Sequence, residues 1–222
     1  MQKWFFDLRT RPFVLLVIAF IFVTILVHFE ITAQFDESVV EYFQSILGNP
    51  GLDLLMQSIT EAGDIYYMLG FGIILLIIRK TRRIGITIMI LLVIATILTG
   101  YIKCGVDRDR PNLEFTGTPF LIELSPDTYA LFCEGGFNAS YPSGHAARAT
   151  IIGIILGFSL SGLFPRGCYL LLLYPLLMSI SRVYVLQHFP MDVIGGAILG
   201  ALLVGVIGKK TKLYKIHKNS KT

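Results

Sequence analysis

Six long apolar segments dominate this chain of 222 residues and restrict it to an architecture of membrane-spanning helices. Apolar residues make up 54% of the sequence and the mean hydropathy is +0.69. Charged residues account for only 15%, against about a quarter in an average soluble protein. A helix crosses a bilayer with about 20 mostly apolar residues, or about 17 where flanking residues or a thin bilayer help. The segments therefore predict an all-α polytopic membrane protein with six transmembrane helices: Phe13–His28, Ile65–Ile78, Ile84–Tyr101, Ala146–Phe164, Cys168–Ile180 and Val193–Ile207.

The Lys and Arg residues predict the orientation of these six helices. If the helices alternate in direction, 14 of the 19 fall on one side, in residues 3–11, 79–83, 166 and 209–221. Basic loops mark the cytoplasmic side, so both termini should be cytoplasmic. Every acidic residue except Asp7 then falls on the extracytoplasmic side. Topology and attraction to anionic lipid explain the basic tail better than nucleic-acid binding does.

Two connections on the extracytoplasmic side are long. After the first span, apolar residues recur at helical spacing in 35–47 and 52–59, and Asn49-Pro50-Gly51 separates the two stretches. This pattern predicts two short amphipathic helices in the membrane interface. We expect them to cover the end of the bundle rather than to flank a lipid entrance. For the second connection, residues 112–140, we expect a lid or a substrate-facing wall.

The first of three polar clusters follows the third predicted span. Lys103, Asp107 and Arg110 lie on one helical face if that helix continues past Tyr101, because steps of four and three keep residues in register. Two cations in this arrangement can bind different oxygens of one phosphate, and the carboxylate can orient them. Taken alone, the cluster is better explained as a snorkelling Lys at a charged helix end.

The second cluster, Pro142-Ser143-Gly144-His145, precedes the fourth predicted span. A Pro-Ser pair ahead of an apolar run is typical of a helix start, and Gly lets a backbone approach closely. The free amides and the dipole of a helix start suit an anion, as does the Ser143 hydroxyl. His145 would then reach a leaving oxygen as a general acid. Taken alone, the cluster is a helix cap followed by an ordinary histidine.

The third cluster joins the last two predicted spans. Arg182 lies at the end of an apolar helix, where a cation is costly unless it meets an anion or a carboxylate. His188 and Asp192 are four residues apart, with Pro190 suited to a helix start between them. The carboxylate can then hold one ring nitrogen and leave the other free to attack phosphorus. By itself, His188 could equally be a core histidine.

Two features leave alternatives open. Arg148 falls inside a span, and it either adds a fourth cation to the site or pairs with a carboxylate, which we favour slightly. Cys104 and Cys133 fall on the extracytoplasmic side and could form a disulfide, although cysteines near spans are more often packing residues. No Cys or His spacing typical of a metal site occurs in the sequence.

Together the three clusters resemble the signature of the type 2 phosphatidic acid phosphatase (PAP2) superfamily, a group of membrane lipid phosphatases. These enzymes are also similar to vanadium haloperoxidases and glucose-6-phosphatase. The order of the clusters, their internal spacings and their shared membrane side all agree. The resemblance implies one PAP2-like domain over residues 1–222, with its core motifs in 103–192. The connection between the first two clusters is longer than in compact bacterial members, so substrate choice does not carry over from those.

The resemblance also implies roles for individual residues. His188 would be the nucleophile that forms a phosphohistidine, Asp192 would orient it, and His145 would protonate the departing oxygen. The phosphoryl oxygens would be bound by Lys103, Arg110, Ser143, Gly144 and Arg182. Members of this group generally need no metal, so no cofactor is expected.

The expected function is therefore hydrolysis of a lipid mono- or diphosphate at the extracytoplasmic face of a plasma or inner membrane. A polyprenyl diphosphate is our first hypothesis for the substrate, followed by phosphatidic acid and phosphatidylglycerol phosphate. The alternatives are a PAP2-type lipid phosphotransferase and a non-catalytic lipid-binding or transport protein. A membrane serine protease is disfavoured because Ser143 has no Gly two residues before it. The sequence does not indicate an oligomeric state.

Overall fold

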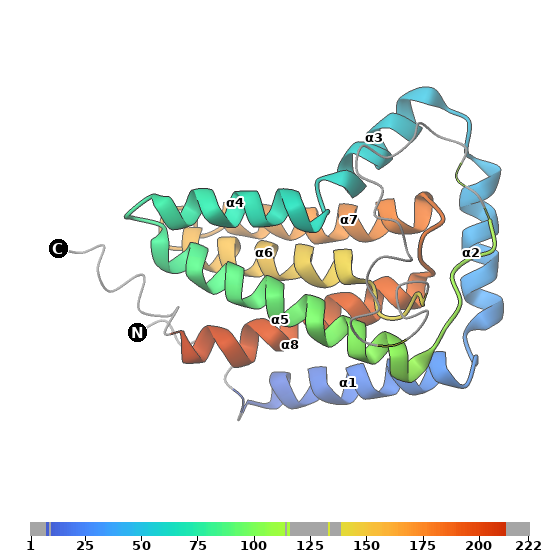
Figure 1. Cartoon of the computed structure of the whole chain (residues 1–222), viewed down its shortest axis with the longest axis horizontal. Helices are drawn as coiled ribbons and strands as arrows, with labels where there is room; N and C mark the ends of the chain where they lie inside the picture. The colour runs from blue at the N-terminus through green and yellow to red at the C-terminus, as the bar shows by residue number, and fades with distance from the viewer. Residues whose placement is uncertain (1–7, 9, 114, 116–132, 134–138, 212–222) are drawn as a thin grey trace.

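The protein is a bundle of long helices with two short helices across one end (Figure 1). The structure, a computed structural model, describes residues 8, 10–113, 115, 133 and 139–211, and these residues contain no β-strand. The elements in chain order are α1 (Arg11–His28), α2 (Ala33–Ser45), α3 (Pro50–Glu61), α4 (Ile65–Ile77), α5 (Arg82–Val106), α6 (Gly144–Leu160), the 3-10 helix η2 (Gly167–Leu172), α7 (Leu173–Tyr184) and α8 (Pro190–Lys210).

Side-chain caps explain where several helices begin. Asn49 accepts hydrogen bonds from two amides in the first turn of α3, at 3.2 and 3.3 Å. Asp64 accepts from the amide of Tyr66 at 2.9 Å and starts α4. These caps satisfy amides that have no partner inside the helix. Pro190 occupies the first turn of α8, where its missing N–H costs nothing.

Helix α6 lies at the centre of the bundle, packed against α5, α7 and α8 (Figure 1). Glycines allow its contact with α8 to be unusually close. A Cβ on Gly196 would collide with the carbonyl oxygen of Ser143, and a Cβ on Gly200 would collide with that of Ala147. Small residues at such spacing let two helix backbones approach each other. The two helices therefore run parallel, and both begin at the same end of the bundle.

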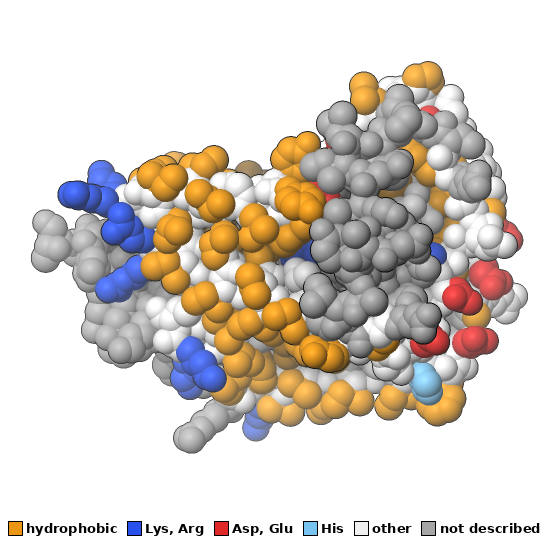
Figure 2. Space-filling model, viewed as in Figure 1, with side chains coloured by type: hydrophobic (Ala, Val, Ile, Leu, Met, Phe, Trp, Pro, Cys, Tyr) orange, Lys and Arg blue, Asp and Glu red, His pale blue; other side chains and the backbone are white. Residues whose placement is uncertain are grey.

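The charged side chains separate along the long axis of the molecule. On the face shown in Figure 2, hydrophobic side chains cover the middle of the helices. Lys and Arg gather at the end where α1 begins and α8 ends, and acidic side chains gather at the opposite end, near α2. The basic residues of 79–83, 166 and 209–210 are exposed. This separation of charge agrees with the asymmetry expected from the sequence.

The number of membrane-spanning helices agrees only in part with the expected six. Within the described residues, four segments are long and apolar enough to cross a membrane: α1, α5, η2 with α7, and α8. A fifth results if α3 and α4, which meet at a bend of 56°, count as one broken span. Helix α6 is apolar but has only 17 residues. It ends at Leu160 rather than at Phe164, so it falls short of the usual spanning length.

The connections at the acidic end differ in how well the structure describes them. The two short helices expected between the first two spans are α2 and α3. A disulfide joins Cys104, near the end of α5, to Cys133. Of the two alternatives left open for these cysteines, the disulfide is the one that forms, whereas Cys168 is free and buried. Most of residues 112–140, where we expected a lid, lies outside the described residues.

Candidate active site

The three sequence clusters meet at one end of the bundle, where α5 and α7 end and α6 and α8 begin (Figure 1). The amide of Ser143 donates to the carbonyl of Asp192 at 2.9 Å, which fixes the start of α6 against the start of α8. Arg110 donates to the side-chain oxygen of Gln187 at 2.6 Å and ties the first cluster to the third. Polar side chains that lie far apart in the sequence therefore occupy one region.

His188 lies in the turn between α7 and α8, and its side chain is only 2% exposed. Burial lowers the pKa of His188 well below its usual value. The positive charges of Arg182, Arg110 and Lys103 lower this pKa further. The imidazole is therefore neutral at pH 7, with a lone pair on one ring nitrogen. A neutral imidazole is the form that can act as a nucleophile.

Asp192, in the first turn of α8, is fully buried beside His188. Its Oδ2 lies 3.6 Å from Nδ1 of His188, which is too long for a hydrogen bond but close enough to attract the ring when it carries positive charge. Oδ2 instead accepts from the amide of Phe189 at 2.8 Å, and Oδ1 accepts from Arg108 at 2.8 Å. Asp192 is therefore next to His188, as expected, but at 3.6 Å it does not form a hydrogen bond with the ring.

Arg108, which the sequence clusters did not identify, joins two fully buried carboxylates. One terminal nitrogen donates to Asp192 at 2.8 Å, and the other donates to Asp36 of α2 at 2.8 Å. The guanidinium also lies over the ring of Phe189, 4.2 Å from its centroid. Bridging two carboxylates in this way uses the fixed fork of Arg, which Lys cannot reproduce. The short helix α2 is thereby connected to the carboxylate next to His188.

The sequence around Asp36 indicates a buried carboxylate, although Asp36 belongs to none of the three clusters. Asp36 lies three and four residues before Val39 and Val40, so it belongs to the apolar face of α2. A carboxylate on a buried face needs a cation or several donors. Burial raises the pKa of Asp36, and the neighbouring Arg108 opposes that rise. The identity of the partner, 72 residues away, could not be read from the spacing.

The start of α6 provides two amides that are available to a ligand. The Ser143 hydroxyl accepts from the amide of Ala146 at 3.4 Å and so acts as the helix cap. The amides of Gly144 and His145 come before it and have no hydrogen-bond acceptor among the described residues. Amides at a helix start, together with the helix dipole, form a favourable position for an anion.

His145 lies among the same cations as His188. The charges of Arg182, Arg148 and Arg110 act on its ring, and the His188 imidazole is also close enough to interact with it. The two histidines therefore share one electrostatic environment at the end of the bundle.

Several cations of the site have no carboxylate partner in the part of the chain that the structure describes. Among the described residues, no carboxylate oxygen lies within 4.0 Å of Lys103, Arg148 or Arg182. Lys103 donates to the carbonyl of Ala139 at 2.5 Å, and Arg182 is only 7% exposed. A buried cation without a counter-ion favours an anionic ligand, because removal from water is otherwise costly.

Arg148 has no carboxylate at ion-pair distance among the described residues, which differs from the pairing that we favoured from the sequence. Its Nη2 lies 3.4 Å from the carbonyl oxygen of Gly63 and 3.4 Å from Nδ1 of His145. Asp64 attracts the guanidinium only from beyond ion-pair distance. Because Arg can only donate, Nδ1 of His145 is the acceptor in this contact.

Asp107 does not have the orienting position that the helical register predicted. Helix α5 ends at Val106, and Asp107 is an exposed residue in the left-handed conformation, with φ of 50°. Lys103 therefore lies on the helix, whereas Arg110 lies in the segment after it, which has no regular secondary structure. The two cations approach the site from different backbone elements rather than from one helical face.

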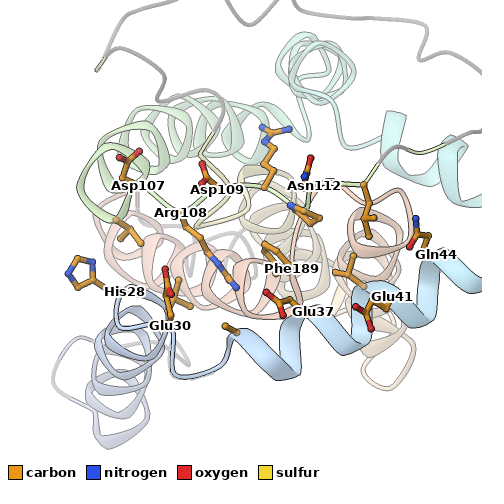
Figure 3. Close-up of a pocket in the computed structure, with 17 residues that line it drawn as sticks. His28, Glu30, Glu37, Glu41, Gln44, Asp107, Arg108, Asp109, Asn112 and Phe189 are labelled. Carbon is orange, nitrogen blue, oxygen red and sulfur yellow. The ribbon is translucent and has the colours of Figure 1, made fainter.

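A separate cavity of about 510 Å³ lies beside the site, between the α1–α2 junction, α2 and residues 106–113 (Figure 3). Arg108 and Arg110 line it, but so do five carboxylates: Glu30, Glu37, Glu41, Asp107 and Asp109. This acidic lining would repel a phosphate, so the cavity differs in character from the cation cluster. The described residues hold no group of three or more His, Cys, Asp or Glu side chains that could bind a metal.

The chain is similar in sequence to several known proteins. The undecaprenyl-diphosphatase of Sulfolobus acidocaldarius is 34% identical over 165 residues, 73% of this chain and 73% of that protein. Phosphatidylglycerophosphatase B of Bacillus subtilis is 26% identical over 195 residues, 83% of this chain and 87% of that protein.

The fold and the family follow from two further comparisons. The crystal structure of a transmembrane PAP2-type phosphatidylglycerolphosphate phosphatase from Bacillus subtilis shares the fold, with a TM-score of 0.73 at 23% identity. The alignment covers 91% of this chain and 97% of that one. The sequence profile of the PAP2 superfamily matches residues 68–212, which is more than half of the chain. The chain therefore belongs to the PAP2 superfamily and is a membrane phosphatase of that family.

Proposed function

We propose that the protein hydrolyses a lipid phosphate through a phosphohistidine intermediate on His188, with a polyprenyl diphosphate as the preferred substrate. The observation that carries the mechanism is the buried, neutral His188 imidazole among three cations. The similarity to the undecaprenyl-diphosphatase of Sulfolobus acidocaldarius supports the choice of lipid. Phosphatidylglycerol phosphate and phosphatidic acid are the next candidates.

The first chemical step joins the enzyme to the phosphoryl group. A ring nitrogen of His188 forms a bond to phosphorus, and the bond between phosphorus and the leaving oxygen breaks. His145 acts as a general acid in its imidazolium form, which the negative charge of the bound phosphate favours, and gives its proton to that oxygen. Asp192 stabilises the positive charge that develops on the His188 ring, from the 3.6 Å separation seen here. In the second step, water attacks the phosphohistidine, gives a proton to His145 and releases phosphate.

The cations and the helix start stabilise the phosphoryl group during transfer. A loose phosphoryl-transfer transition state spreads charge over three equatorial oxygens, so positioned positive charge provides most of the catalysis. Lys103, Arg110 and Arg182 supply that charge in our proposal. The amides of Gly144 and His145 donate to the same oxygens, while Ser143 holds the helix start in place through its cap.

We further propose six membrane crossings with the site at the extracytoplasmic face. The six are the four long spans, the bent α3–α4 pair as one span, and the shorter α6. The exposed basic side chains at the opposite end support a cytoplasmic location for both termini. The Cys104–Cys133 disulfide supports an oxidising compartment at the site end, since such bonds are rare in the cytosol.

The test is phosphate release by the purified full-length protein in detergent, with a chelator present, against a panel of lipid mono- and diphosphates. We expect release from the wild-type protein and, for His188→Ala, a loss of about 10⁴-fold or more, because the covalent route is removed. The same variant should lose acid-labile labelling by a ³²P-labelled substrate. Normal turnover by folded His188→Ala would contradict the mechanism.

Two controls separate this function from its alternatives. His28→Ala removes a histidine at the end of α1 that lies outside the cation cluster, so it should retain phosphate release and labelling. Transfer of the label to an added lipid alcohol in preference to water would instead identify a phosphotransferase. Failure of the wild-type protein to release phosphate from any lipid would refute the proposed function.

A further inference from the structure

Arg148 is the strongest feature that the proposed reaction leaves unexplained. Its side chain is 8% exposed, and its Nε has no hydrogen-bond acceptor among the described residues. No described carboxylate lies within 4.0 Å of the guanidinium. A cation so placed is unfavourable unless a ligand brings negative charge. In the proposed reaction Lys103, Arg110 and Arg182 bind the transferred phosphoryl group, and Arg148 has no role in that reaction.

The guanidinium of Arg148 covers the first turn of α6. Side chains in a helix lean toward its N-terminus, so a residue three or four positions along covers that turn. Nη2 lies 3.4 Å from Nδ1 of His145. Nη1 lies 3.0 Å from the position that a Cβ on Gly144 would occupy, so glycine leaves room for the charge. The two amides without acceptors belong to this same turn.

The charges around the two histidines are not the same. Lys103 is among the groups that act most strongly on His188, whereas Arg148 is among those that act most strongly on His145. In the proposed reaction His188 faces the phosphorus that is transferred, and His145 faces the oxygen that leaves. Nη2 of Arg148 also contacts the His145 ring directly, at 3.4 Å from Nδ1, so Arg148 belongs to the leaving-group side of the proposed reaction.

We propose that Arg148 binds the phosphate that remains on the lipid, which makes a lipid diphosphate rather than a lipid monophosphate the substrate class. This inference rests on the proposed phosphatase function. A His188 nitrogen bonds to the terminal phosphorus, and the electron pair of the broken bond stays on the bridging oxygen. That oxygen, which receives the His145 proton, belongs to the departing lipid monophosphate. A monophosphate substrate leaves as an alcohol and has no phosphate for Arg148 to bind.

The test compares a prenyl diphosphate with the prenyl monophosphate of the same chain length, using the full-length protein in detergent. Arg148→Met should lower kcat/KM for the diphosphate by about 10- to 100-fold, because it removes a charged hydrogen bond to the leaving phosphate. For the monophosphate, kcat/KM should fall by less than about threefold. Arg148→Lys should recover part of the loss. Arg182→Met is the matched control, because it removes a buried cation that both substrates use and should lower both values equally.

Inhibition provides a second measurement that does not depend on turnover of the variant. Inorganic pyrophosphate should compete with a fluorescent prenyl diphosphate for the wild-type protein better than inorganic phosphate does, and Arg148→Met should lose that difference. Should Arg148→Met fail to fold, Arg148→Lys must still shift the ratio of kcat/KM values against the diphosphate.

The outcomes distinguish this proposal from the one on which it rests. Equal losses for both substrates in a folded Arg148 variant would show that Arg148 acts only through His145, and would overturn the assignment to the leaving phosphate. Phosphate release from neither substrate by the wild-type protein would refute the proposed function itself.

Discussion

The two ends of the bundle hold the same kinds of basic side chain in opposite environments. At the end where α8 finishes, Lys and Arg are exposed around the helix termini (Figure 2). At the end where α8 begins, Arg148 and Arg182 are buried and lack carboxylate partners within the described part of the chain. Exposed cations remain hydrated and orient the helices, whereas buried cations favour an anionic ligand. Whether a basic residue orients the helices or binds an anionic ligand is therefore decided by its burial and not by its residue type.

Among the basic residues, the largest effect should come from removing a buried cation at the site end. We expect Arg182→Met to lower kcat/KM for any accepted lipid phosphate by about 10²- to 10³-fold, as for the loss of one donor to a developing charge. Steady-state kinetics on the detergent-purified variant provide the measurement. A loss smaller than about fivefold would place Arg182 outside the phosphate site, since a structural cation of that kind would spare the chemical step.

A somewhat smaller effect should follow from breaking the link between α2 and Asp192. We expect Arg108→Gln to leave Asp36 and Asp192 as two buried carboxylates without a cation, and to destabilise the protein by about 3–5 kcal/mol. Because the carboxylate beside His188 is then displaced, kcat should fall about 10- to 100-fold with little change in KM. Thermal unfolding and kinetics together measure both effects.

The double variant Asp36→Asn with Arg108→Gln tests whether this link is specific. The two changes should be strongly non-additive in stability, since each removes the same interaction. Additive losses would show that Asp36 and Arg108 act independently, and the connection from α2 to the catalytic residues would have to be abandoned.

Removing a buried cation should shift the acid limb of the pH profile, whereas removing an exposed cation should not. His188 must be unprotonated to attack, and burial with its neighbouring cations lowers its pKa well below the usual 6.5. Activity in kcat/KM should therefore persist as the pH falls through 6.5 and decline only below it. Arg182→Met removes one cation, so its acid limb should move to higher pH. An unchanged limb in that variant would separate Arg182 from His188.

The smallest effect is expected at the basic end. Arg83 is exposed at the start of α5, and neutralising one such charge in Arg83→Gln should change kcat/KM by less than about twofold, because exposed charges are screened by salt. The acid limb should also stay where it is in the wild-type protein. A large loss of turnover here would mean that the cations of the two ends are not functionally distinct.

The clusters were accessible to sequence reasoning because each is local in the chain. The spacing from His188 to Asp192 and the cap at Ser143 both follow from helix starts, which have recognisable sequence signals. The helical register of Lys103, Asp107 and Arg110 was wrong, because Asp107 adopts a left-handed conformation that ends α5. The favoured carboxylate partner of Arg148 was also wrong, since its contacts are a carbonyl and an imidazole.

The amino-acid sequence by itself determined that the chain forms apolar helices, with basic residues at one end and three polar clusters at the other. These properties depend on composition and on spacing within about 10 residues, which local geometry converts into helix faces and ends. Only the tertiary structure decided that Arg108 bridges Asp36 to Asp192, and that α6 lies against the glycines of α8. Contacts of this kind depend on how closely distant helices pack, and that distance is not encoded in the spacing of either partner.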